Sequence, residues 1–463
     1  MKACPQRTAV ARSTALAALV TALVSSTARG QEPPFDARPE IAPPYYRVRY
    51  GAGSDEGSLA LPATFTVWIP PGVERLRGIV VHQHGCGTGS SSSGLTGAHD
   101  LHWQALAAKH DCALLAPAFE QPDSLGCQLW CDPWNGSADA LFRALADLGE
   151  QSGHAELRSL PWALWGHSGG GRWAGAMACM FPARTVAVWL RSGVPPIADD
   201  AAAPDASPLS LPDDTLGVPM VCNLGVKEGV RDIDERFKGV WPANQAFFRA
   251  VRSRGGLIAV AIDPSSSHDC GNQRYLAIPW LDACLTARLP AAADDTGLPE
   301  PLRPMDVAAG WLAPVDGGEP IAAAGFDGDA LEMGWLPDEP TARLFAAYVK
   351  DTLVPDDTPP PPPTRVHLAD GRLTWECVAD LESGLAGFVV ERDGVRIATL
   401  PENPKHPFGR PLFQRLQYSD TPPLPLPGFE FAVPQGSGTY RVIAVNTVGL
   451  ESAPSAAAVP PAE

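Results

Sequence analysis

Positive charge is scarce in this sequence of 463 residues. It carries 35 lysines and arginines against 52 aspartates and glutamates, a formal net charge of −17. An acidic surface repels both the phosphate backbone of nucleic acids and anionic lipid headgroups. We therefore expect no nucleic acid and no membrane among its partners.

Long hydrophobic runs are also missing beyond the first 30 residues. The apolar stretch from Ser13 to Val24, STALAALVTALV, is too short to span a bilayer comfortably. Basic residues precede it and small residues follow it, which is typical of an export signal. The sequence predicts a signal peptide over residues 1–30 and a secreted or periplasmic protein, with an N-terminal membrane anchor as the alternative.

A zinc-binding pair of cysteine motifs is absent. Cys127 and Cys131 bracket CQLWC, but no second pair stands at a suitable spacing. Nine cysteines lie outside the predicted signal, so at least one is a free thiol, and export permits disulfides among the others. We expect a disulfide from Cys86 to either Cys127 or Cys131.

Four histidines raise the question of another metal site. His82 and His84 alternate on a predicted strand and point the same way, and His99 and His102 follow. No carboxylate ligand stands at the usual spacing from them. We expect no metal and no cofactor.

A proline run, residues 356–364, divides the chain. Such a run is extended and semi-rigid, so it separates a domain over 31–355 from one over 365–459. Neither part contains an internal repeat.

The upstream part alternates short apolar runs with stretches of helical periodicity. Near-continuous apolar runs are typical of parallel strands that are covered on both faces. The pattern predicts an α/β domain with a doubly wound, mostly parallel sheet and antiparallel edge strands near residues 48–70. The expected buried strands are 77–85, 112–119, 162–168, 185–193, 219–225 and 256–263.

The downstream part alternates apolar and polar residues with a period of two, which predicts an all-β antiparallel sandwich. Asp393 and Gly394 mark a hairpin turn. Trp375 and Tyr440 fit the core tryptophan and corner tyrosine of such sandwiches. With LAGFVVERDGVRIATL and TYRVIAVNTVGLES, residues 365–459 resemble a fibronectin type III domain. Its role is that of a spacer or of a module that docks on a surface.

The stretch ALWGHSGGGRWAG contains Gly-x-Ser-x-Gly between a predicted strand and a predicted helix. A nucleophile on such a sharp turn needs very small neighbours, and Gly166 and Gly170 supply them. A P-loop requires Gly-Lys-Ser/Thr, and Arg172 and Trp173 follow the glycines instead. The dinucleotide fingerprint Gly-x-Gly-x-x-Gly is absent as well. We therefore interpret Ser168 as an exposed nucleophile.

The partners of this serine should follow as an acid and then a histidine. His268 comes directly after the last predicted strand of the sheet. Glu228 lies on the turn after the strand 219–225, and Asp232 and Asp234 are the alternative acids. The first amide of the helix, on Gly169, is expected to bind an oxyanion.

With HGCG at residues 84–87 and the later Gly-x-Ser-x-Gly, the domain resembles α/β-hydrolases, and in particular secreted esterases similar to polyhydroxybutyrate depolymerases and feruloyl esterases. The resemblance implies Ser168 as nucleophile, His268 as base, and the amides of Gly169 and Cys86 as the oxyanion hole. The acid in that group is usually aspartate, so Glu228 departs from its pattern.

These features predict a carboxylic ester hydrolase that works through an acyl-enzyme. A serine peptidase of the same fold and an inactive, polymer-binding relative are the alternatives. Substrate contacts are expected from Trp130, Trp134 and His167, since aromatic faces suit sugars, phenols and polyester surfaces. The expected partner is a small or polymeric ester, including polysaccharide or polyester surfaces.

Overall fold

The computed structural model describes residues 35, 38–55, 57–197, 209–290, 300–315, 317–402, 410–434 and 437–459. The predicted signal peptide lies outside these ranges. None of the helices in them combines the length and the apolar character that crossing a membrane would require.

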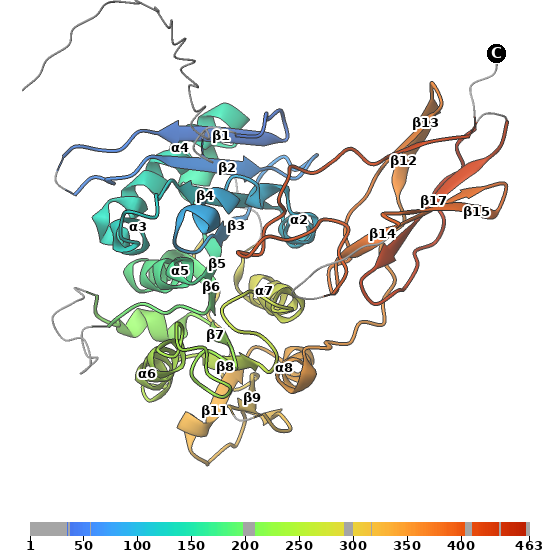
Figure 1. The fold of residues 1–463 in the computed structure, drawn as a ribbon. Helices are drawn as coiled ribbons and strands as arrows, with labels where there is room; N and C mark the ends of the chain where they lie inside the picture. The colour runs from blue at the N-terminus through green and yellow to red at the C-terminus, as the bar shows by residue number, and fades with distance from the viewer. Residues whose placement is uncertain are drawn as a thin grey trace, which may run out of the picture.

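An eight-stranded sheet forms the centre of the larger domain (Figure 1). Its order is β1-β2-β4-β3-β5-β6-β7-β8; β2 is antiparallel to both of its neighbours, β1 and β4, and the remaining neighbours are parallel. The strands are β1 Tyr45–Tyr50, β2 Ala63–Trp68, β3 Gly78–Gln83, β4 Cys112–Phe119, β5 Trp162–His167, β6 Thr185–Arg191, β7 Met220–Gly225 and β8 Ile258–Asp263.

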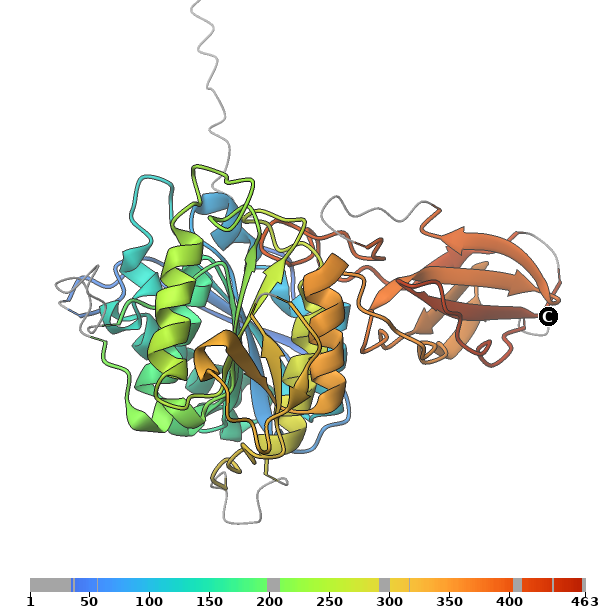
Figure 2. The ribbon, with the colours of Figure 1, turned by 90° about the horizontal axis from the view of Figure 1, so that it is seen from below.

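Helices cover both faces of this sheet, as both ribbon views show (Figures 1 and 2). One face packs on α3 Gln128–Cys131, α4 Ser137–Ser152, α5 Gly169–Met180 and α6 Val240–Arg252. The other face packs on α2 Leu101–Lys109, α7 Arg274–Arg288 and α8 Glu339–Asp351. The short α1 Thr88–Ser93 follows β3. Each face has its own buried apolar cluster, which explains why the strands are apolar throughout.

This strand order, with the sharp turn at Ser168 between β5 and the helix that follows it, is the α/β-hydrolase fold. All six predicted parallel strands are present within a few residues of the predicted bounds. The two strands predicted over 48–70 are β1 and β2: β1 is the edge strand, and β2 lies between β1 and β4 and is antiparallel to both. A small sheet, which the sequence analysis did not predict, adds β9 Trp311–Pro314, β10 Ile321–Ala322 and β11 Met333–Leu336 beside β8.

The downstream part folds as two facing three-stranded antiparallel sheets. One contains β12 Thr364–Ala369, β13 Arg372–Glu376 and β16 Glu430–Ala432; the other contains β14 Leu385–Arg392, β15 Val395–Leu400 and β17 Tyr440–Asn446. Trp375 and Tyr440 are both buried in the core between the sheets. Asp393 and Gly394 have positive φ angles of 52° and 77° and form the predicted turn of the β14–β15 hairpin.

A segment of this sandwich, Arg410–Pro422, reaches the larger domain and is called the docking loop here. In Figure 1 it is the orange-red segment that runs from the sandwich toward α2 and α7. Gln414 accepts a hydrogen bond from the amide of Leu101 and donates one to the carbonyl of His99, both at 2.8 Å. The sandwich is therefore attached to the hydrolase domain by side-chain contacts as well as by the proline-rich linker.

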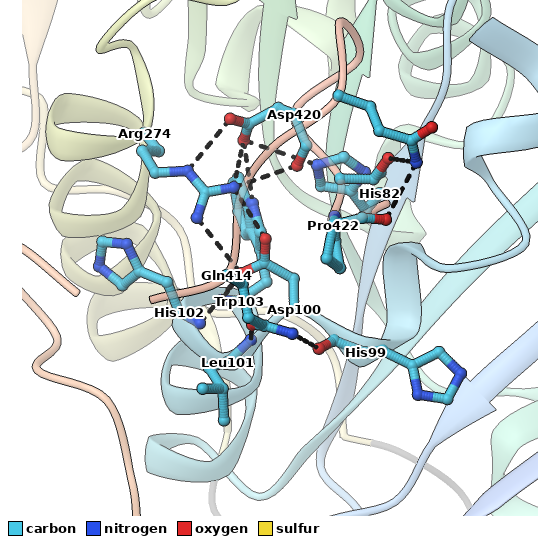
Figure 3. Close-up of polar contacts among 12 residues, drawn as sticks. His82, His99, Asp100, Leu101, His102, Trp103, Arg274, Gln414, Asp420 and Pro422 are labelled. Carbon is cyan, nitrogen blue, oxygen red and sulfur yellow. Dashed lines mark hydrogen bonds and ion pairs between the residues drawn. The ribbon is translucent and has the colours of Figure 1, made fainter. Parts of the chain in front are cut away.

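The strongest of these contacts is a buried ion-pair network around Arg274 (Figure 3). Its guanidinium contacts Asp420 of the docking loop at 3.0 Å and Asp100 of the hydrolase domain at 2.8 Å, and all three side chains are at most 2% exposed. Asp420 also accepts hydrogen bonds from Trp103 and Gln273. Burial alone would raise the pKa of Asp420, but the nearby charge of Arg274 holds it well below its usual value.

Replacing Asp420 with alanine is expected to lower the free energy of unfolding by about 3–5 kcal/mol, because it leaves the buried charge of Arg274 with half of its partners. Denaturant unfolding would measure the loss. The control is Glu430→Gln, which removes an Arg–carboxylate pair on the same sandwich whose side chains are half exposed; such pairs contribute little. Equal stabilities of the two variants would contradict the prediction.

Candidate active site

Ser168 stands on the turn between β5 and α5. Its backbone angles, φ 56° and ψ −118°, are strained for a residue with a side chain. A Cβ on Gly166 would overlap the carbonyl of Gly170, and a Cβ on Gly169 would overlap both sulfur atoms of a disulfide. The glycines around the serine therefore provide the room that the sharp turn and its neighbours need.

His268 lies beside this serine, on the loop after β8. Its Nε2 is 2.8 Å from Ser168 Oγ, and its Nδ1 is hydrogen-bonded to Glu228 Oε1. Glu228 lies on the turn after β7 and is fully buried. The structure thus joins the serine, the histidine and the glutamate by two consecutive hydrogen bonds. The three residues come from the carboxyl ends of three parallel strands.

The second carboxylate oxygen of Glu228, Oε2, also has hydrogen-bond partners. Oε2 accepts hydrogen bonds from Ser192 Oγ at 2.7 Å and from the amide of Gly225 at 2.6 Å. These donors fix the carboxylate so that Oε1 faces the imidazole. The alternative acids lie elsewhere: Asp232 is exposed, and Asp234 accepts a hydrogen bond from Ser267 Oγ.

Two residues that hold Glu228 and the His268 loop in place were not predicted. Ser192 stands at the carboxyl end of β6, next to β5, which leads into Ser168, so its position along the sequence offered a signal. The buried Arg191 donates to the carbonyls of Ser267 and Asp269, on either side of His268. It thereby anchors the loop that carries the histidine.

The two residues expected to supply the oxyanion hole, Cys86 and Gly169, line the same cavity as Ser168. The amide of Gly169 is the first of α5, and neither it nor the amide of Cys86 donates to another backbone group in the described part of the chain. The loop after β3 passes next to Ser168, because a Cβ on Gly85 would lie 3.3 Å from Ser168 Cβ. These amides are the expected oxyanion donors.

The loop that carries the Cys86 amide is held on several sides. A disulfide joins Cys86 to Cys127, one of the two pairings that the sequence left open. The next amide, of Gly87, donates to Gln121 Oε1 at 3.2 Å. Burial lowers the pKa of His84 to about 4, so its ring is neutral; Nε2 accepts from the Phe119 amide and Nδ1 donates to the Gly85 carbonyl.

Replacing Cys127 with serine is expected to lower kcat by roughly 10- to 100-fold, because displacing the Cys86 amide by about 1 Å weakens oxyanion binding. Steady-state kinetics on an ester substrate would measure this. Cys377→Ser is the control, since Cys377 is a half-buried free thiol in the sandwich. An unchanged kcat in the Cys127 variant would contradict the assigned role of the disulfide.

A cavity of about 380 Å³ opens at the serine. Phe237 forms part of its wall and stacks face to face on His268, with ring centroids 3.9 Å apart. Other lining residues are Cys86, Cys127, Arg172, Gly193, Arg236 and Val240. A larger cavity of about 780 Å³ lies beside β9 and β11, but it contains no nucleophile with a base beside it.

The expected substrate contacts need correction. Trp130 is fully buried: it stacks on Phe119 and donates to Gln121 Oε1, so it is a core residue. His167 is also fully buried, is not among the residues that line the cavity, and donates from Nε2 to the carbonyl of His268. Trp134 is half-buried against the same core and does not line the cavity described above.

The four histidines considered for a metal site have separate partners. His82 stacks on Trp165, His99 stacks on Tyr45, and His102 donates to the carbonyl of Leu381. In the described ranges, three potential ligands come within reach of one ion only at Asp356, Asp380 and Glu382, a group that contains no histidine.

No protein-family model and no curated protein matches the sequence. Among solved structures, a thermostable esterase is similar, with 13% identity over 47% of this chain and 54% of that chain, at a TM-score of 0.32. An S-formylglutathione hydrolase from Agrobacterium tumefaciens has 15% identity over 50% of this chain and 90% of that chain, at a TM-score of 0.31. A siderophore hydrolase from Aspergillus nidulans has 14% identity over 50% of this chain and 92% of that chain, also at a TM-score of 0.31. The chemistry of the site has to be inferred from its own residues.

Proposed function

We propose that the protein is a serine hydrolase that cleaves carboxylic esters through an acyl-enzyme. The observation that carries this proposal is the hydrogen-bonded series from Glu228 through His268 to Ser168, beside two backbone amides that donate to no backbone group among the described residues. A nucleophile, a base, a residue that orients the base and an oxyanion site are the parts that acyl transfer requires.

The direction of the hydrogen bonds gives the first step. Ionised Glu228 only accepts, so His268 donates from Nδ1, and its Nε2 is free to accept the proton of Ser168. Ser168 Oγ then attacks the ester carbonyl, and the negative charge that develops on oxygen lies at the amides of Gly169 and Cys86. The imidazolium that forms is stabilised by Glu228.

The second step returns the proton. His268 protonates the leaving alcohol, and the acyl group stays on Ser168 Oγ. A water molecule, deprotonated by the same Nε2, releases the acid and restores the serine. No step needs a metal or a cofactor.

The setting of this reaction is part of the proposal. The Cys86–Cys127 disulfide beside the nucleophile is typical of an oxidising compartment, in accord with export of the protein. The cavity at Ser168 would take the acyl or the alcohol part of a small ester, or one unit of a polymeric ester.

The test uses the full mature chain with p-nitrophenyl acetate and butyrate, with peptide p-nitroanilides in parallel. The expected result is ester turnover with a burst of one p-nitrophenol per active site, and labelling of Ser168 by a fluorophosphonate located by mass spectrometry. Turnover of the peptides alone would assign a peptidase. Neither turnover nor labelling would overturn the proposal in favour of an inactive, binding protein.

A further inference from the structure

The docking loop reaches further than the interface between the domains. It starts in the core of the sandwich, where Phe413 packs edge-on against Phe388 with ring centroids 5.3 Å apart. Gln414 and Asp420 then fasten it to the hydrolase domain on either side of Ser419 (Figure 3). Ser419 is thus held between two fixed points, and it is fully buried.

The hydroxyl of Ser419 contacts two parts of the candidate active site. Its Oγ lies 3.3 Å from the amide of Gly85, in the loop that carries the Cys86 amide. It also lies 3.1 Å from Nδ1 of His167, the residue directly before the nucleophile. The sandwich therefore contacts the oxyanion loop and the nucleophile turn through one atom.

The direction of each hydrogen bond in this series, from the Gly85 amide through Ser419 and His167 to the His268 carbonyl, is fixed. His167 Nε2 is 2.8 Å from the carbonyl of His268, which can only accept, so Nε2 carries a proton. Burial, followed by the charges of His268 and Arg191, holds the pKa of His167 well below its usual value, and the ring is neutral. Nδ1 therefore accepts from Ser419, and Ser419 Oγ accepts in turn from the Gly85 amide.

We propose that Ser419 of the β-sandwich is a positioning residue of the hydrolase active site, which holds the oxyanion loop and, through His167, the backbone of His268. This inference rests on the function proposed above. It makes the downstream domain a part of the catalytic unit. The sequence had instead suggested a spacer or a module that docks on a surface.

The position of the oxyanion amide explains why this contact matters. The amides on either side of Cys86 are both tied: Gly87 to Gln121, and Gly85 to Ser419. The amide between them is left to face the substrate oxygen. Without the Ser419 hydroxyl, the Gly85 amide loses its partner, and Nδ1 of His167 loses the one donor that the described residues offer it.

Positioning can be separated from docking, because other residues fasten the loop. Asp420, Gln414 and Gln417 make its contacts with Arg274, the 99–101 backbone and Thr96. Thr421 offers a matched control in the same loop. It is equally buried, but its hydroxyl accepts a hydrogen bond only from Gln417 of the loop itself, at 3.2 Å, among the described residues.

The experiment compares Ser419→Ala with Thr421→Val and the parent in the full chain. Each protein is assayed on p-nitrophenyl butyrate and for its rate of fluorophosphonate labelling, with the Tm as a check on folding. We expect Ser419→Ala to lower kcat and the labelling rate by roughly 10- to 100-fold, with KM changed by less than about twofold. Thr421→Val is expected to behave as the parent.

Each outcome decides the matter. If Ser419→Ala keeps kcat within about twofold of the parent, Ser419 has no positioning role and the proposed function stands. If Thr421→Val loses as much activity as Ser419→Ala, the effect belongs to the loop as a whole and the inference also falls. If the parent itself is neither active nor labelled at Ser168, the proposed function fails and takes this inference with it.

Discussion

Replacing Ser168 with alanine is expected to lower kcat on p-nitrophenyl esters by about 10⁴- to 10⁶-fold, with little change in KM. Without Oγ there is no nucleophile for His268 to activate at 2.8 Å, and no acyl-enzyme forms. The amides of Gly169 and Cys86 remain and still stabilise the oxyanion of a slow attack by water. The initial burst and the fluorophosphonate label should both disappear.

Ser168→Gly is the matched control for the fold. It removes the same nucleophile but also relieves the strained backbone at φ 56° and ψ −118°, which costs about 1–3 kcal/mol for a residue with a Cβ. We expect it to be as inactive as Ser168→Ala and more stable, as measured by denaturant unfolding. An alanine variant that retained a tenth of the parent's kcat would exclude Ser168 as the nucleophile.

The hydrolase fold was largely predictable because its signals are local. Each parallel strand is an apolar run, since both faces of the sheet are covered, and β4 was predicted at its observed bounds, Cys112–Phe119. The positions of Ser168, Glu228 and His268 follow from the same fact. Parallel strands place the turns at their carboxyl ends on one edge, so a residue just after β5, β7 or β8 comes near the others.

The contacts of the docking loop could not be predicted in this way. Ser419 and Asp420 lie in an all-β pattern, about 250 residues after Ser168, and nothing in the neighbouring sequence indicates a partner in another domain. The expected substrate contact of Trp130 was wrong for a related reason. A tryptophan between two cysteines looks like part of an exposed loop, but α3 turns it onto Phe119 and into the core.

Replacing Glu228 with glutamine is expected to lower kcat by about 10⁴-fold while leaving the fold and KM nearly unchanged. Ser192 Oγ and the Gly225 amide both donate toward Oε2, so the amide oxygen of the glutamine should take that place. The amide nitrogen then faces His268 Nδ1 and donates to it. The imidazole is forced into the tautomer with its proton on Nε2, which cannot accept the proton of Ser168.

Asp232→Asn is the matched control, because it neutralises an exposed acid of the same loop, whose side chain is 75% exposed and paired only with Arg231 among the described residues. Its kcat should equal that of the parent. The pair of variants, assayed on p-nitrophenyl butyrate, also distinguishes the two ways in which Glu228 could act. A loss of charge alone would cost a few fold, whereas the wrong tautomer removes the base entirely, so a kcat within tenfold of the parent in Glu228→Gln would contradict the orientation inferred for this site.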